Sequence, residues 1–113
     1  MTSADGSLCF GDLCIGSAGT TVTLAGQPVQ LTFREHELLR FLAEHSDTWL
    51  TREQLLRHVW GEEYQGGGRT VDVHVVRLKA RIEDEQHTYI DRPRDGGFRF
   101  HPEERRDGAN DDR

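Results

Sequence analysis

The chain has 113 residues, of which 35% are hydrophobic and 30% are charged, and its formal net charge is −6. This length suits one compact domain with a single core. No apolar stretch reaches the length of a membrane span, and the first residues lack the basic and apolar blocks of a secretory signal. The acidic balance argues at face value against a nucleic-acid-binding protein, because most such domains are basic.

Composition divides the chain into three parts. Residues 1–7 are small and polar, which predicts a flexible lead-in. Residues 101–113 carry eight charges and no aliphatic side chain larger than that of Ala109, which predicts a disordered acidic tail. Residues 8–100 are therefore expected to form the folded domain.

The first part of this domain has the patterns of short strands. Two apolar runs, residues 8–10 and 13–15, flank Gly11-Asp12. Residues 21–24 alternate polar and apolar side chains, residues 25–28 are typical of a turn, and residues 29–31 resume the alternation. Four strands in an antiparallel meander are expected.

The two cysteines, Cys9 and Cys14, lie in this strand region. They cannot complete a zinc site, because no CxxC or HxxxH pattern accompanies them. We expect two small apolar side chains in a reduced compartment, with a redox pair across a hairpin as the alternative.

Two capping boxes mark the starts of helices. Thr32 and Glu35 form a Thr-x-x-Glu box, which predicts a helix that ends near residue 44 or 45. Thr51, with Gln54 at the third helical position, opens a second helix, which is expected to close at Trp60-Gly61.

Residues 70–82 are predicted to form a third helix, after a glycine-rich loop over residues 61–68 that lacks the Lys-Ser or Lys-Thr of a phosphate-binding loop. Its core stripe should comprise Val71, Val75, Leu78 and Ile82. A second face spans about 100° of arc and comprises Thr70, Val73, His74, Arg77 and Arg81. Two strands, residues 88–90 and 97–100, then enclose a basic hairpin tip.

This order of elements predicts an α+β fold, a winged helix-turn-helix with an N-terminal four-stranded antiparallel sheet, a three-helix core and a C-terminal β-hairpin wing. A helix fits the DNA major groove, and the fork of an arginine matches O6 and N7 of guanine, so Arg77 is the candidate base reader. Val73 can pack on a thymine methyl group. Arg92 and Arg94 at the hairpin tip are expected to enter the adjacent minor groove, unless they form an ordinary solvated turn.

Six stretches of residues 8–100 form a recognisable pattern: Phe10–Leu13, Leu31-Thr32 with Glu35 and Leu38-Leu39, Thr51–Leu56, Val59–Gly61, Arg69–Val75, and Arg94 with Gly97–Phe100. This pattern resembles the OmpR/PhoB-type effector domain of bacterial response regulators. The resemblance implies sequence-specific promoter binding, usually by two protomers arranged head to tail on direct repeats. It also implies a protein of the cytoplasm, associated with the nucleoid when bound.

The resemblance assigns roles to residues of this chain. Arg77 would contact a base and Arg94 would enter the minor groove. Phosphate contacts would come from Trp60, Arg69, Thr70, His74 and Lys79. Apart from the resemblance, Arg81 is expected to extend the groove-facing side of the third helix, and Thr51 and Arg52 are expected to support the DNA-backbone contacts. The loop residues Glu62, Glu63 and Tyr64 would face a sigma or alpha subunit of RNA polymerase. No cofactor, metal ion, membrane or enzymatic activity is expected.

Three departures from the family pattern favour weaker or differently specified DNA binding. Val76 stands where the family often has an arginine, Phe98 replaces a tyrosine, and Asp95 replaces a wing glycine. No phosphoacceptor receiver domain is present in these residues, which suggests a fragment or an orphan regulator.

Several of these residues also have plainer explanations. Trp60 and His74 are compatible with packing roles, and Arg69 could pair with Asp72 as an i, i+3 neighbour. The acidic total and the three departures favour a competing function, a winged-helix protein-interaction module with weak or lost DNA binding.

The position of the charges weakens the objection raised by the acidic total. Residues 69–81 carry four basic side chains against Asp72, and residues 92–99 carry three against Asp95. The acidic residues gather in the tails, the first helix, the loop and the run 83–85. A narrow basic strip on an acidic body is therefore expected.

Overall fold

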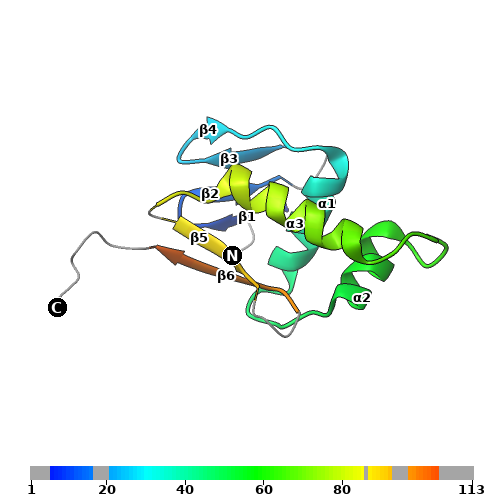
Figure 1. Ribbon diagram of the computed structural model, residues 1–113. Helices are drawn as coiled ribbons and strands as arrows, with labels where there is room; N and C mark the ends of the chain where they lie inside the picture. Colours follow the sequence, from blue (N-terminus) through cyan, green and yellow to red (C-terminus); the bar gives the residue numbers. More distant parts are fainter. Residues whose placement is uncertain (1–5, 17–20, 86, 93–96, 105–113) are drawn as a thin grey trace.

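The computed structural model describes residues 6–16, 21–85, 87–92 and 97–104, and it shows a winged helix in three parts (Figure 1). A four-stranded antiparallel sheet comes first, followed by three helices and an antiparallel hairpin. This is the predicted α+β architecture. The elements are β1 (Leu8–Phe10), β2 (Leu13–Ile15), β3 (Val22–Leu24), β4 (Gln27–Pro28), α1 (Phe33–Glu44), α2 (Arg52–Leu55), α3 (Arg69–Ile82), β5 (His87–Asp91) and β6 (Arg99–Glu104).

The fourth strand lies earlier than the sequence predicted. β4 pairs with β3 through Gln27 and Pro28, which had been placed in a turn, whereas residues 29–31 lie outside the strand. The turn consists of Ala25 and Gly26, both with positive φ, at 54° and 82°. A two-residue turn of this kind matches the twist of paired strands, so the strand resumes directly after it.

Cys9 and Cys14 are joined by a disulfide across β1 and β2. The expectation of two reduced side chains was therefore wrong, and the alternative, a pair across a hairpin, is what the structure shows. The two-residue turn Gly11-Asp12, in which Gly11 has φ 60°, sets the register that places the two cysteines directly opposite each other. Their Cα atoms are 4.1 Å apart.

The capping boxes of α1 and α2 form as predicted. Thr32 Oγ1 accepts a hydrogen bond from the Glu35 amide at 3.1 Å, and the Glu35 carboxylate accepts one from the Thr32 amide at 3.0 Å. Thr51 and Gln54 make the same reciprocal pair at the start of α2. α2 passes into a π-helical turn, Leu56–Trp60, and the chain leaves it at Gly61, whose positive φ of 103° favours glycine.

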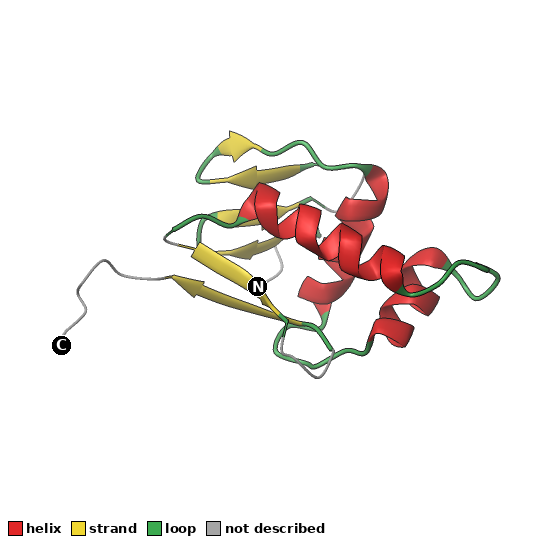
Figure 2. Ribbon diagram, in the orientation of Figure 1, coloured by secondary structure: helices red, strands yellow, loops and turns green. Residues whose placement is uncertain are grey.

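The core lies where the helices meet the two sheets. α1 contributes Leu38, Leu39 and Leu42, the first sheet contributes Leu13 and Ile15, and the hairpin contributes Phe98 and Phe100. Figure 2 shows the strands at one end of the molecule, and α2 with the loop that follows it at the other. Among the described residues, no helix is both long enough and apolar enough to span a bilayer.

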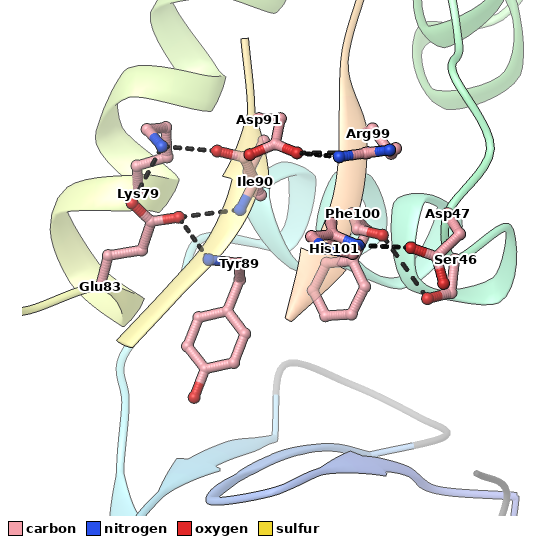
Figure 3. A network of polar contacts seen from close by, with 10 residues as sticks. All are labelled: Ser46, Asp47, Lys79, Glu83, Tyr89, Ile90, Asp91, Arg99, Phe100 and His101. Carbon is pink, nitrogen blue, oxygen red and sulfur yellow. Dashed lines mark hydrogen bonds and ion pairs between the residues drawn. The ribbon is translucent and has the colours of Figure 1, made fainter. Parts of the chain in front are cut away.

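The closing hairpin is longer than predicted. β6 runs to Glu104 and pairs His87 with Glu104, so the strand occupies residues that had been assigned to the tail. His101 is held to Asp47 at 2.5 Å, and the Asp47 amide donates to the Phe100 carbonyl at 2.8 Å (Figure 3). These bonds to the α1–α2 connection extend the strand despite its polar composition. Residues 105–113 lie outside the described part of the chain.

Reduction of the Cys9–Cys14 disulfide should lower the free energy of unfolding. The bond closes a short loop, and restricting the unfolded chain in this way is worth up to about 2 kcal/mol. Urea unfolding with and without dithiothreitol measures the effect. The Cys9→Ser/Cys14→Ser double variant should show no response to the reductant, and an equal response in both proteins would contradict the assignment.

The buried histidine of α1 should make the fold less stable in mild acid. Burial lowers the pKa of His36 below its ordinary value of 6.5, against an opposing hydrogen bond with the Gly16 backbone. The unfolded chain therefore binds more protons below about pH 6.5, and stability should fall as the pH drops through that range. We expect a smaller fall in His36→Gln, measured by urea unfolding from neutral pH downward. An unchanged slope would contradict this role.

Candidate nucleic-acid interface

α3 has a buried face and an exposed face on opposite sides, and burial of the first determines which residues of the second meet solvent. The predicted stripe is confirmed, since Val71, Val75, Leu78 and Ile82 are each 0% exposed. The exposed arc on the other side comprises Arg69, Val73, Val76, Arg77, Ala80 and Arg81. Figure 1 shows α3 running from the glycine-rich loop toward the strands, so its first turns lie at the end of the molecule away from the sheets.

An open hollow lies on this outer face. It has a volume of about 370 Å³ and is lined by Arg69, Asp72, Val73, Val76 and Arg77. Within the described residues, no hydrogen bond or ion pair engages the guanidinium groups of Arg69 and Arg77. Both cations are therefore available to a ligand from outside.

Asp72 connects three elements at the start of this face. Its carboxylate accepts from Arg52 on α2 at 3.1 and 3.2 Å, and it lies 3.9 Å from Arg92 at the end of the β5 segment. The alternative pairing of Arg69 with Asp72 is thus replaced by two partners from other elements. A Cβ atom at Gly68 would meet Arg52 Cδ at 2.5 Å, so glycine leaves room for this arginine to reach Asp72.

Trp60, Thr70 and His74 form one cluster beside the helix start. The His74 ring meets Trp60 edge-on, with centroids 5.0 Å apart, and His74 Nδ1 donates to the Thr70 carbonyl at 2.8 Å. The Arg34 guanidinium lies over the Trp60 ring at 5.6 Å. His74 is half-buried, so its packing role is established by the geometry and only part of its ring faces solvent.

Two basic residues of the predicted interface are engaged inside the fold. Lys79 Nζ donates to Glu83 at 2.9 Å and to the Ile90 carbonyl at 2.6 Å (Figure 3). The Glu83 carboxylate also accepts from the amides of Tyr89 and Ile90, both at 2.8 Å. This network ties the end of α3 to β5 and draws Lys79 away from the open hollow.

Arg81 is held in the same way by a buried acid. Its Nε lies 3.3 Å from the Glu35 carboxylate, which is 1% exposed, and it also donates to the Gln30 carbonyl at 3.0 Å. A buried carboxylate needs such a partner, because removing it from water is costly. Periodicity placed Arg81 on the polar arc but could not show this contact.

The predicted wing is only partly described. The Arg92 guanidinium lies 5.8 Å from the centre of the Phe98 ring, and Phe98 is buried and paired with Leu50 in an isolated bridge. Phe98 therefore packs in the core at the position where the family pattern has a tyrosine. Arg94 and Asp95 lie outside the described residues.

The loop after Trp60 carries the exposed residues Glu62, Glu63 and Tyr64. The Tyr64 ring lies 6.5 Å from that of Trp60. A smaller open hollow of about 160 Å³ lies beside it, lined by Glu53, Leu56, Arg57, Gly61, Glu62 and Tyr64.

Val76 belongs to the exposed face, although sequence reasoning treated it only as a lost arginine. Its side chain is 52% exposed and lies three residues after Val73, which is 38% exposed. Residues spaced by three share a helix face, so this spacing could have grouped the two valines.

Comparison with known proteins agrees with this geometry. The pattern of a family described as "Transcriptional regulatory protein, C terminal" matches residues 26–100. The sensory transduction protein RegX3 of Mycolicibacterium smegmatis is 40% identical over 81 residues, which cover 72% of this chain but only 36% of that protein. The chain thus spans about a third of this relative's length.

Solved structures show the same fold. The response regulator DrrB, a Thermotoga maritima OmpR/PhoB homolog, superposes with a TM-score of 0.75 at 37% identity, over 84% of this chain and 44% of that one. The Klebsiella pneumoniae RstA DNA-binding domain, solved in complex with the RstA box, gives a TM-score of 0.73 at 32% identity, over 84% of this chain and 96% of that one.

Replacing Lys79 should affect stability rather than DNA contacts. Lys79→Ala removes the donor to Glu83 and Ile90, and we expect the free energy of unfolding to fall by about 1–2 kcal/mol. The salt dependence of DNA affinity should stay unchanged, whereas Arg69→Ala should flatten the log–log slope by about one unit. Urea unfolding and fluorescence anisotropy at several salt concentrations measure both. The opposite pattern would restore Lys79 as a phosphate contact.

Proposed function

The chain belongs to the family of C-terminal domains of transcriptional regulatory proteins and is a DNA-binding effector domain of the OmpR/PhoB type; on this basis we propose that it binds promoter DNA sequence-specifically, with α3 in the major groove. One observation carries the proposal. The outward face of α3 bears Arg69 and Arg77, which no described residue engages, directly opposite a fully buried stripe. An α-helix with free arginines on one face is the shape and chemistry that the groove accepts.

Arg77 is the proposed base reader. Its guanidinium can donate two parallel hydrogen bonds to O6 and N7 of guanine, a pattern that no other base pair presents in the major groove. It lies two turns into α3, on the exposed face, beside the hollow.

The start of α3 is the proposed phosphate-binding region. Arg69 and Thr70 lie in its first turn, where amide groups without intrahelical partners favour anions. Arg52 of α2 reaches Asp72 near the same end, and Thr51 is the N-cap residue that precedes Arg52. Trp60 and His74 pack against each other beside Thr70. Arg92 and Arg94 are proposed to contact the adjacent minor groove. Lys79 and Arg81 are not proposed as DNA contacts, because Lys79 bonds to Glu83 and the Ile90 carbonyl and Arg81 pairs with the buried Glu35.

Assembly on DNA follows from the same proposal. Two copies would bind direct repeats head to tail in the cytoplasm, at the nucleoid. The exposed loop residues Glu62, Glu63 and Tyr64, beside the smaller hollow, are proposed to contact a sigma or alpha subunit of RNA polymerase. The domain acts by binding and carries out no catalysis in this proposal.

Loss of Arg77 should remove discrimination at one base. A binding site is first selected from a randomised duplex library, and affinities are then measured by fluorescence anisotropy. Arg77→Ala should cost about 1–3 kcal/mol on this site and relax the preference at one position.

Arg57→Ala is the matched control, because it removes the same charge from an exposed arginine that pairs with Glu53 away from α3. Arg57→Ala should leave the base preference of the domain unchanged. Equal losses of the Arg77 variant on selected and random DNA would contradict the base-reading role. Salt-insensitive binding, or a lost protein partner with unchanged DNA affinity, would favour the protein-interaction module instead.

A further inference from the structure

The outer face of α3 places two exposed valines between two cations. Val73 and Val76 are 38% and 52% exposed, and they line the hollow of about 370 Å³ together with Arg69, Arg77 and Asp72. Single exposed apolar side chains are common and need no explanation. Two β-branched residues on neighbouring turns of one exposed helix face are different, since valine lowers helix propensity and neither side chain belongs to the buried core.

The lining of the hollow defines the ligand it accepts. The cations at its edges favour an anionic surface, whereas the valines between them need an apolar group. In the major groove, phosphates flank the base edges, and the apolar group on those edges is the C5 methyl of thymine. Cytosine lacks this methyl group and presents an amino donor nearby, which valine cannot satisfy.

We propose that Val73 and Val76 together read the C5 methyl groups of two adjacent thymines, next to the guanine contacted by Arg77. Side chains three apart on a helix have Cβ atoms about 5–6 Å apart. Neighbouring bases on one strand are stacked about 3.4 Å apart, so the valines are spaced widely enough to contact two different bases. This inference rests on the proposed DNA binding and adds the bases that the site selects. Val76 becomes a specificity-determining residue at a position where the family pattern has an arginine.

An arginine at position 76 would serve a different purpose. A cation there would add a phosphate contact that all sequences offer equally, and so would raise affinity without discrimination. Valine at this position cannot make the phosphate contact, but it can make an apolar contact that requires a methylated pyrimidine.

The test removes single methyl groups from DNA. In the selected binding site, each thymine is replaced in turn by deoxyuridine, which lacks the C5 methyl but keeps the pairing edge. Two adjacent positions should each lose about fourfold in affinity, the contribution of one buried methyl group. Val73→Ala should abolish the loss at one of these positions and Val76→Ala at the other. Alanine has a higher helix propensity than valine, so both variants should fold. Thermal unfolding checks this.

Two further variants test whether the methyl effect depends on Val76. Val76→Arg should bind random DNA more tightly and lose the methyl effect at its position, whereas Arg57→Ala should keep both effects. Salt-dependent binding of the selected site with no deoxyuridine effect at adjacent positions, or with effects that persist in both valine variants, would overturn this inference and leave the proposed function standing. Absence of any salt-dependent DNA binding would instead overturn the proposed function.

Discussion

Full burial of one stripe of α3 is the constraint on which the exposed face of this helix, the proposed DNA-binding surface, depends. Rotation of the helix would expose Val71, Val75, Leu78 and Ile82, at about 25 cal/mol for each Å² of apolar area. The opposite arc must then face solvent, because side chains repeat every 3.6 residues. Core packing, and not the polar side chains themselves, therefore decides that Arg69 and Arg77 point outward.

The charged residues of α3 divide according to their surroundings. Toward its end, the helix lies against α1 and β5, and there Lys79 and Arg81 satisfy Glu83, the Ile90 carbonyl and the buried Glu35. Toward its start, the Asp72 carboxylate links α3 to Arg52 of α2 and to Arg92. Lys79 and Arg81 thus tie the end of the helix to β5 and α1, whereas Arg69 and Arg77 have no such partner among the described residues.

The sequence predicts an interaction well when the interacting residues are close together in the chain. The two capping boxes and the buried stripe need only neighbours within one or two turns, so Thr32, Thr51 and the stripe were correctly placed. The partners of Lys79 and Arg81 lie elsewhere in the chain, and periodicity gives the direction of a side chain without showing what it meets. β4 was misplaced, and the disulfide was named only as the alternative, for a related reason. Both depend on two-residue turns whose geometry sets the strand register. The three-residue spacing from Val73 could have predicted that Val76 shares its exposed face, but Val76 was interpreted only as the loss of a family arginine.

These contacts explain how a domain with an acidic net charge can still offer cations to DNA. Most cations of the described residues, including Arg34, Arg40, Arg52, Arg57 and Arg99, lie within ion-pair distance of a carboxylate. Such paired charges largely cancel beyond a Debye length of about 8–10 Å. In the proposed complex, a duplex in contact with α3 would meet Arg69 and Arg77 with two valines between them. The acidic remainder of the surface would oppose unspecific approach. A surface of this composition is expected to have little general attraction for DNA, so much of its affinity should depend on the proposed contacts of Arg69 with phosphate and of Arg77 with a base.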